Sequence, residues 1–319
     1  PLLDRMEVIE LTSYTDEEKV EIAKRHLIPK QIKRHGLTKA KCKLSDGAIR
    51  ALIRGYTRES GVRVLERQIG ALCRKVAMRI VEQGVKSISI TENNLEELLG
   101  IPRYHPDHIP QTEQVGVVNG LAWTSVGGEI LEVEVGVVPG TGKVELTGNL
   151  GDVMKESAHA ALTYIRSRAA QLGIEADFYK TKDVHIHFPE GAVPKDGPSA
   201  GIAITTAMVS ALTGAPVKRE LAMTGEVTLR GRVLPIGGLK EKTMAAYRNG
   251  IRTVIVPADN QKDLEEIDPT VKVGLRFVTV EQVDQVLAEA LDLIVSDPGP
   301  ELSQPHAPAQ TAELPNLRQ

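Results

Sequence analysis

Aromatic side chains are scarce in this chain, at 3% of residues with a single tryptophan, so its cores must be built from aliphatic residues. Only two cysteines are present, Cys42 and Cys73, and they lie outside any metal-ligand spacing. We expect two reduced thiols in a cytoplasmic protein rather than a disulfide framework or a zinc site. No apolar run approaches the roughly 18 residues of a membrane-spanning helix, and the start lacks a signal-peptide pattern.

The chain also lacks an excess of charge of either sign. Its formal net charge is −3, which gives no electrostatic argument for nucleic acid as the main partner. Charged residues make up 25% of the chain and hydrophobic residues 41%, as in an ordinary globular protein. A length of 319 residues suffices for two domains with separate cores. Because the chain opens at Pro1 inside what reads as a structured segment, we expect a fragment of a longer protein.

Residues 1–100 have the pattern of a small helical domain. Thr15 and Glu18 have the spacing of a capping box, and Ser45 precedes a second amphipathic run. A third apolar stripe starts near Gly61. Beyond it, a short alternating strand and one last helix complete the domain, which should hold one strand pair at most.

Residues 101–113 break every periodicity and contain three prolines in their first ten positions, so we interpret them as a domain linker. Mixed helix and strand patterns follow over 114–296. The segment 297–319 is rich in proline and polar residues, and we expect a disordered tail there. The predicted fold class is therefore α+β in two domains, a small helical one followed by a mixed α/β one.

Three local expectations within residues 114–296 can be compared directly with a structure. The strand pattern at 130–138, a Pro-Gly-Thr-Gly turn and a second strand at 144–147 predict a hairpin. Asp152 is expected to cap a long helix that ends at Gly173. The stretch 184–188 alternates as a strand and leads into a turn that contains Ser199.

Two segments carry the chemistry. Pro194-Lys-Asp-Gly-Pro-Ser-Ala-Gly201 presents the Ser199 hydroxyl in a turn of small and rigid residues, and Gly237-Gly-Leu-Lys-Glu-Lys242 opens a helix with two lysines. A serine becomes a good nucleophile when a neighbouring base takes its proton, and a neutral lysine can be that base. The two segments together suggest a serine–lysine peptidase. Taken alone, Ser199 could equally be a helix N-cap.

The base must be chosen between Lys240 and Lys242, which point to nearly opposite faces of a helix. Lys242 shares its face with Leu239, Ala245 and Ala246, which would exclude water from its ammonium and lower its pKa. Spacing alone prefers Lys242 only weakly, and Lys240 fits a solvated lysine at a helix start.

The serine turn and the lysine segment closely resemble those of Lon proteases, and the resemblance extends from Leu2 to about Val295. It implies that Ser199 and Lys242 are the catalytic pair and that Thr224 hydrogen-bonds the lysine. It also implies that Glu226 lines the site and that Asp196 belongs to the same pocket. Trp123, in Gly-Leu-Ala-Trp, also falls within a segment that resembles the family. His185 and His187 are candidates for support of the active site from the residues alone, because they share one face of the strand that leads into the serine turn.

For several of these residues a structural role is an alternative. Trp123 could be a partly buried packing residue. His185 and His187 share one strand face with Asp183, but a zinc hydrolase needs three well-placed ligands, so we expect no metal there. A structural face, or support near the active site, remains open for the two histidines.

The helical domain resembles the small lid subdomain of a Lon ATPase. By this resemblance Arg63 matches the sensor-2 arginine that contacts nucleotide, and Arg5 matches the arginine finger that reaches a neighbouring subunit. For Arg63, a surface ion pair with Glu59 or Glu66 is the alternative. The segment 136–143 has the wrong spacing for a phosphate loop, so ATP and magnesium would be bound only in the full-length protein.

The resemblance implies an ATP-dependent serine endopeptidase that degrades unfolded or damaged proteins in quality control and stress response. It also implies a homohexameric ring in the cytoplasm. We expect unfolded proteins and peptides as substrates, no cofactor for peptide hydrolysis itself, and neither membrane nor nucleic acid as a partner of this fragment. A non-catalytic assembly or adaptor module is the rival class, and the presence of both dyad residues argues against it.

Overall fold

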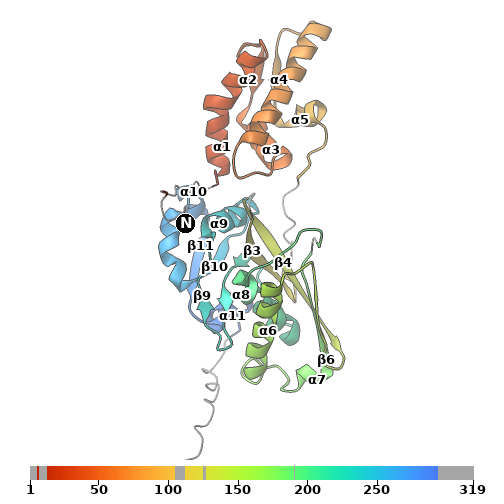
Figure 1. The fold of residues 1–319 in the computed structure, drawn as a ribbon, viewed down its shortest axis with the longest axis vertical. Helices are drawn as coiled ribbons and strands as arrows, with labels where there is room; N and C mark the ends of the chain where they lie inside the picture. The colour runs from red at the N-terminus through yellow and green to blue at the C-terminus, as the bar shows by residue number, and fades with distance from the viewer. Residues whose placement is uncertain (1–5, 7–12, 105–111, 125–126, 190, 294–319) are drawn as a thin grey trace, which may run out of the picture.

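The computed structural model describes residues 6, 13–104, 112–124, 127–189 and 191–293. They form two modules with separate hydrophobic cores: the N-terminal module (residues 13–104) and the C-terminal module (residues 112–293). Figure 1 shows the N-terminal module stacked above the C-terminal one. Arg5, most of the expected linker and the expected tail lie outside the described residues. None of the helices that are described has the length and apolar character needed to cross a bilayer.

The N-terminal module is helical with one short parallel strand pair, β1 with β2. Its elements are α1 (Asp16–Ile22), a π-helical turn (Ala23–Leu27), α2 (Ile28–Arg34), β1 (Cys42–Leu44), α3 (Asp46–Tyr56), α4 (Arg63–Gln83), β2 (Ile88–Ile90) and α5 (Glu92–Leu99). The sequence patterns explain the helix starts. Thr15 and Glu18 form the predicted capping box of α1, and the Ser45 hydroxyl accepts a hydrogen bond from the Ala48 N–H at the start of α3. These predictions are confirmed.

The apolar stripes of these helices meet in one core. Leu65, Ile69, Leu72 and Val76 of α4 are buried, as their spacing predicts. Both cysteines are free and lie in the same core. Helix α5 belongs here as well, because Leu95 and Leu98 pack into this cluster.

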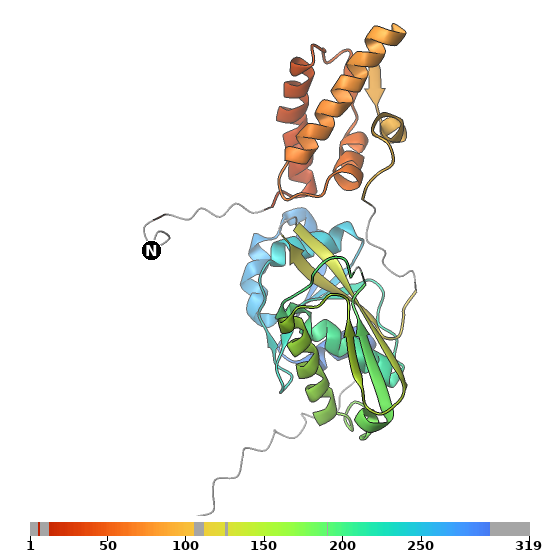
Figure 2. The same cartoon turned by 45° about the vertical axis from the view of Figure 1, so that its right-hand side comes forward.

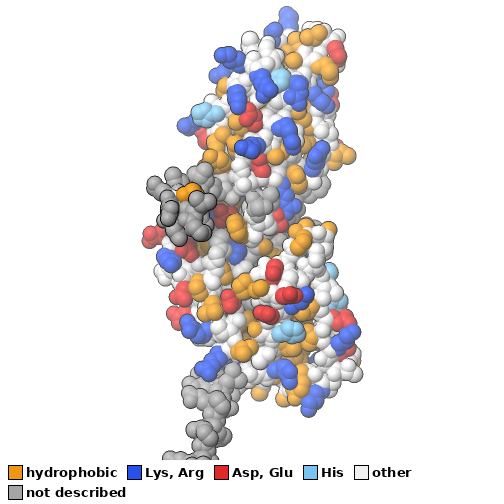
Figure 3. Space-filling model, in the orientation of Figure 1, with side chains coloured by type: hydrophobic (Ala, Val, Ile, Leu, Met, Phe, Trp, Pro, Cys, Tyr) orange, Lys and Arg blue, Asp and Glu red, His pale blue; other side chains and the backbone are white. Residues whose placement is uncertain are grey.

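Charge is unevenly distributed between the modules. Figure 3 shows Lys and Arg side chains over much of the visible face of the N-terminal module. Between residues 13 and 99, Lys and Arg outnumber Asp and Glu although the whole chain is slightly acidic. The net charge of the chain therefore does not describe this module, and the absence of a nucleic-acid partner stays a prediction.

The C-terminal module is built on a seven-stranded mixed sheet with the strand order β11-β10-β7-β3-β4-β6-β5. Its main strands are β3 (Val117–Thr124), β4 (Gly127–Pro139), β5 (Val144–Thr147), β6 (Lys182–His187), β7 (Leu221–Met223), β10 (Thr253–Pro257) and β11 (Arg276–Val280). A small antiparallel pair is formed by β8 (Glu226–Val227) and β9 (Val233–Leu234). The helices are α6 (Asp152–Ser167), α7 (Phe178–Thr181), α8 (Gly201–Thr213), α9 (Leu239–Arg248), α10 (Pro269–Gly274) and α11 (Val283–Leu291), with a 3-10 segment at Ala258–Glu266.

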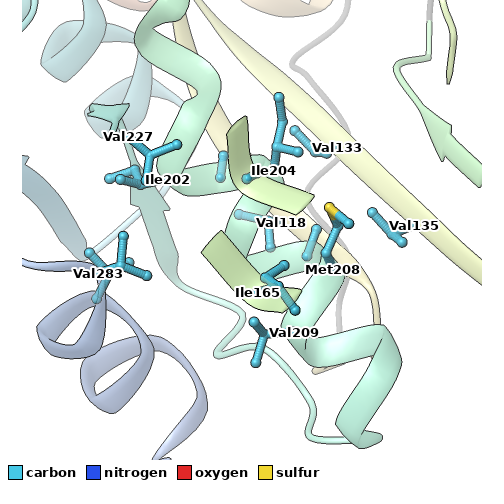
Figure 4. Packing of buried hydrophobic residues seen from close by; sticks show 14 of the residues in the cluster. Val118, Val133, Val135, Ile165, Ile202, Ile204, Met208, Val209, Val227 and Val283 are labelled. Atoms are coloured by element: carbon cyan, nitrogen blue, oxygen red, sulfur yellow. The ribbon is translucent and has the colours of Figure 1, made fainter. Parts of the chain in front are cut away.

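The sheet has a core on each face. Val118 of β3 faces a cluster built with α6, α8 and α11, whereas Leu121 of the same strand faces a cluster built with α9 and α10. Figure 4 shows the first cluster, in which Ile204 and Met208 of α8 lie against Val133 and Val135 of β4. Helix α8 is apolar nearly all round because it is the central, fully enclosed helix of this layer.

The predicted hairpin at 130–147 is wrong. β4 and β5 both exist, but β6 lies between them, antiparallel to β4 and parallel to β5. The intervening turn is held by β6, since the Asp183 carboxylate accepts hydrogen bonds from the N–H groups of Thr141 and Lys143, at 2.7 and 2.8 Å. The turn residues therefore reverse the chain without pairing the two strands that flank them.

The predicted helix from Asp152 to Gly173 is also corrected. α6 ends at Ser167, and Gly173, with φ of 69°, closes a separate turn rather than the helix. Asp152 is the first helical residue and not the cap. The cap residue, Gly151, offers no side chain, and the carboxylate of a distant residue takes over that role, as described next.

Candidate active site

Ser199 lies in the 3-10 turn Pro198–Ala200 that leads directly into α8. Gly197 before it has φ of 122°, a conformation that favours glycine, and this lets the chain reverse sharply ahead of the serine. The N-cap of α8 is Ala200, and no side-chain capping bond is made there, so the alternative role of Ser199 as an N-cap is not what the structure has.

Asp196 fixes this turn to the neighbouring helix. Its Oδ1 accepts hydrogen bonds from the N–H groups of Met154, at 3.1 Å, and of Gly197, at 2.9 Å. Asp196 therefore caps the N-terminus of α6 from the serine turn, where a carboxylate also interacts favourably with the helix dipole. Gly151 has to be small at this point, because a Cβ there would come within 2.2 Å of the Asp196 carboxyl carbon.

Lys242 lies in the first turn of α9 with its side chain turned into the protein, and it is only 3% exposed. Leu239, Ala245 and Ala246 are buried beside it, as the spacing predicts. Burial without a neighbouring carboxylate lowers the pKa of Lys242 from 10.5 to about 8. Lys240 is only half-buried.

Thr224 connects the lysine with the serine turn. It follows β7, and its Oγ1 accepts a hydrogen bond from Lys242 Nζ at 3.1 Å and donates one to the Ser199 carbonyl oxygen at 3.3 Å. The same carbonyl accepts the N–H of Gly225 at 2.9 Å. Thr224 thus bridges Lys242 and the backbone of Ser199 by hydrogen bonds. Among the described residues, no direct hydrogen bond links Ser199 Oγ to Lys242 Nζ. Such contacts are often long before substrate binds.

A groove of about 890 Å³ runs past these side chains. Ser199, Lys242 and Asp196 line it together with Trp123, which is 59% exposed. Trp123 lines the groove and is mostly exposed rather than partly buried. One part of its indole packs against Gly238, where a Cβ would come within 2.9 Å of the ring. Gly238 has φ of 69°, so the turn before α9 needs glycine for both reasons.

The groove is also lined by two carboxylates that sequence reasoning missed, Asp263 and Glu266. They come from the 3-10 segment that follows β10. Asn260 in that segment binds the backbone of Ile236 through both its amide oxygen and its amide nitrogen, and so fixes the segment to the loop before α9. The only sequence signal is a short acidic run after a buried strand, and such runs are common on surfaces.

Three predicted site residues lie elsewhere. Glu226 belongs to β8 and does not line the groove. His185 and His187 lie on β6, where both rings contact the Thr147 hydroxyl, at 2.8 and 2.7 Å. A supporting role of the histidines near the groove is not seen, and the described residues contain no cluster of three or more metal-ligating side chains.

Arg63 is the exposed first residue of α4. The ion pairs that were its alternative are not present among the described residues. Glu59 instead accepts the N–H groups of Val64 and Leu65, both at 2.8 Å, and Glu66 binds Lys30 at 2.7 Å. Arg63 is therefore held on the surface at a helix start.

Comparison with known families gives two matches that together cover most of the chain. Residues 89–293 match the family described as Lon protease (S16) C-terminal proteolytic domain, and residues 33–89 match the Lon protease AAA+ ATPase lid domain. The boundary at residue 89 differs from the packing, because α5 belongs to the core of the N-terminal module.

Curated relatives share more than half of the aligned residues. The Lon proteases of Heliobacterium modesticaldum and Desulforamulus reducens are 60% and 58% identical over 291 residues, which is 91% of this chain and 36% of each relative. Lon protease 1 of Bacillus subtilis is 57% identical over 291 residues, or 91% of this chain and 38% of the relative. The chain thus spans little more than a third of the length of these relatives.

Proposed function

Because the chain belongs to the Lon protease family, we propose that its C-terminal module hydrolyses peptide bonds with Ser199 as the nucleophile and Lys242 as the general base. The observation that carries this proposal is the environment of Lys242. Its amine is buried without a carboxylate partner, and its pKa is lowered to about 8, so a useful fraction is neutral near physiological pH. A structural lysine of a helix surface would be solvated or paired with an acid.

In the proposed reaction the neutral Lys242 amine removes the proton of the Ser199 hydroxyl while the oxygen attacks the substrate carbonyl carbon. The proton then passes to the leaving amine as the peptide C–N bond breaks, which leaves an acyl-enzyme. A water molecule gives its proton to Lys242 and attacks the ester, and collapse of that intermediate releases the acid and restores the Ser199 hydroxyl. Thr224 accepts one N–H of Lys242 and thereby orients the lone pair toward the serine turn.

The remaining groove residues have supporting roles in this proposal. Asp196 fixes the serine turn to α6 through the Met154 N–H. The first two N–H groups of α8 stabilise the turn itself, because Gly201 donates to the Pro198 carbonyl and Ile202 to the Gly225 carbonyl. Trp123 provides an exposed apolar wall against which an extended substrate can lie. A groove of about 890 Å³ leaves room for an extended segment of an unfolded chain or a peptide. No metal or cofactor is needed for these steps.

For the whole protein we propose the ATP-dependent activity of the family, in a cytoplasmic homohexamer that degrades unfolded or damaged proteins under stress. The segment 136–143 connects β4 to β5 rather than a strand to a helix, so it does not form a phosphate loop. Arg63 is the one nucleotide-sensing candidate that the described residues include. Magnesium and the ATP phosphates would be bound by residues other than those described.

The experiment compares peptide cleavage by Ser199→Ala, Lys242→Arg and Lys240→Arg proteins with that of the parent chain. We expect no cleavage by the first two, since alanine has no nucleophile and a guanidinium does not deprotonate in proteins. Lys240→Arg is the matched control and should retain activity. Cleavage by a folded Ser199→Ala protein would overturn the assignment and would favour the non-catalytic assembly module. Loss of activity in Lys240→Arg alone would show that the wrong lysine was chosen.

A further inference from the structure

Helix α9 has two functional faces. Lys242 and Ala246 on one face are buried in the C-terminal module. The other face, with Lys240, Met244 and Arg248, lines a cavity of about 70 Å³ that lies between the two modules. The cavity is closed on its far side by residues of the N-terminal module. Figure 1 shows α9 at the top of the C-terminal module, beneath α1, and Figure 2 shows the two modules in the same stacked arrangement.

An ion pair joins the last turn of α9 to the N-terminal module. Arg248 Nη1 donates to Asp16 Oδ1 at 3.3 Å. Asp16 is the first residue of α1 and Arg248 the last residue of α9. A carboxylate at a helix N-terminus and a cation at a helix C-terminus each interact favourably with the helix dipole. Each partner of this ion pair is therefore stabilised by the helix on which it lies.

This ion pair is shielded from water on the Asp16 side, whose side chain is 11% exposed, compared with 36% for Arg248. Lys19 lies next to the pair and is 5% exposed. Its Nζ donates to the Glu59 carbonyl, and burial is the largest cause of its lowered pKa. Arg54 approaches the second Asp16 oxygen at 3.9 Å. Asp16 is thus surrounded by three cationic side chains, Lys19 and Arg54 of the N-terminal module and Arg248 of the C-terminal module.

A second ion pair acts on the first turn of α9 through β4. Arg58 Nη2 binds Glu129 Oε1 at 2.6 Å. Glu129 follows Gly128, which packs so tightly on α9 that a Cβ there would come within 2.0 Å of the Glu241 carbonyl oxygen. Because Glu241 directly precedes Lys242, the N-terminal module acts on the first turn of this short helix through β4 and contacts its last turn directly.

We propose that Asp16 and Arg248 are positioning residues, which hold α9 so that Lys242 stays within reach of Ser199. The proposal rests on the proposed peptidase function. It gives the N-terminal module a direct part in peptide hydrolysis within this chain. Loss of the pair lets α9 shift, and a displacement of about 1 Å between reacting groups can cost up to 100-fold in rate. The start of α9 is one wall of the groove, but its other walls come from β3, the serine turn and the 3-10 segment, so we expect substrate binding to change less than the rate.

The test measures kcat and KM for peptide cleavage by Asp16→Asn, Arg248→Gln, the double variant and Arg248→Lys. We expect kcat to fall by about 10- to 100-fold in each Asn or Gln variant, with KM changed less than about twofold and with no further loss in the double variant. Arg248→Lys, which retains the charge, should recover part of the rate. Arg252→Gln is the matched control, because it removes an exposed arginine four residues past Arg248 and should behave like the parent.

Folding is checked by thermal unfolding of each protein, and the Asn and Gln variants provide two independent ways to break the pair. Unchanged kcat in either folded variant, or an equal loss in Arg252→Gln, would overturn the proposal. Multiplying losses in the double variant would do the same, because the two residues would then act separately. These failures differ from a failure of the peptidase assignment, which would appear as cleavage by Ser199→Ala.

Discussion

Burial of an ammonium at position 242 must destabilise the folded protein, and this cost can be measured. The lysine pKa falls from 10.5 to about 8 on folding, which corresponds to roughly 3 kcal/mol. Below pH 8 both the folded and the unfolded states carry the proton, so the full penalty is present. Between pH 8 and 10.5 the folded state has released its proton while the unfolded state retains it, so the free energy of unfolding rises with pH. Above 10.5 the penalty is gone.

Lys242→Met removes the charge and keeps a similar volume. The variant loses the hydrogen bond to Thr224, which costs about 1 kcal/mol, although Thr224 keeps its bond to the Ser199 carbonyl. At pH 7 we therefore expect Lys242→Met to be about 2 kcal/mol more stable than the parent, with a melting temperature higher by roughly 4–8 °C. The advantage should vanish by about pH 10.5.

Urea denaturation of the two proteins at several pH values between 7 and 10.5 gives the difference directly. Lys240→Met is the matched control, since it removes an ammonium from the half-buried side of the same helix and should give no stabilisation at pH 7. The claim that Lys242 is a buried ammonium that destabilises the fold would be refuted by either of two results. One is a difference in unfolding free energy between Lys242→Met and the parent that stays constant over this pH range, and the other is a variant less stable than the parent at pH 7.

Three further predictions follow from the same site. Peptide cleavage should increase with pH through about 8 and then level off, because only the neutral Lys242 accepts a proton; a rate that is flat between pH 6.5 and 9.5 would contradict this. Asp196→Ala should lower the free energy of unfolding by about 1 kcal/mol, because α6 loses its cap, and it should also slow peptide cleavage. A variant as stable as the parent in urea denaturation would contradict the capping role. EDTA should leave peptide cleavage unchanged, and a loss restored by zinc would indicate a metal site, with His185 and His187 as its first candidates.

Local sequence patterns predicted those helices well whose starts and buried faces depend only on residues within the same helix. The capping box at Thr15, the Ser45 cap and the apolar stripe of α4 each depend on residues within a few positions of one another. The buried face of α9 is another example, since Leu239 and Ala245 share it with Lys242 at helical spacing. The structure agrees with the choice of Lys242, which is buried, over Lys240, which is only half-buried.

Features that depend on distant partners could not be predicted. β6 inserts between β4 and β5 from a distant part of the chain, and its Asp183 holds a turn that lies some forty residues away. Asp152 looked like the cap of α6, but the serine turn supplies Asp196 for that purpose. The groove wall at Asp263 and Glu266 is likewise fixed by tertiary contacts of Asn260 and has no local signature.

The resemblance assigned roles that the structure separates. Thr224 does bind the lysine, and Asp196 and Trp123 do line the groove. Glu226, which the resemblance assigned to the site, and the two histidines do not line it. Alternation along the strand predicted that His185 and His187 share a face, but it could not predict what that face meets. The catalytic roles themselves remain predictions for experiment.

The most direct test of the central claim is covalent labelling with a fluorophosphonate, which forms a phosphonate ester with an activated serine hydroxyl as fluoride leaves. Mass spectrometry of the digested protein then locates the adduct. We predict an adduct on Ser199 in the parent and in Lys240→Arg, and none in Lys242→Arg. An unlabelled Ser199 in the parent, or equal labelling of Ser199 in Lys242→Arg, would contradict the serine–lysine dyad.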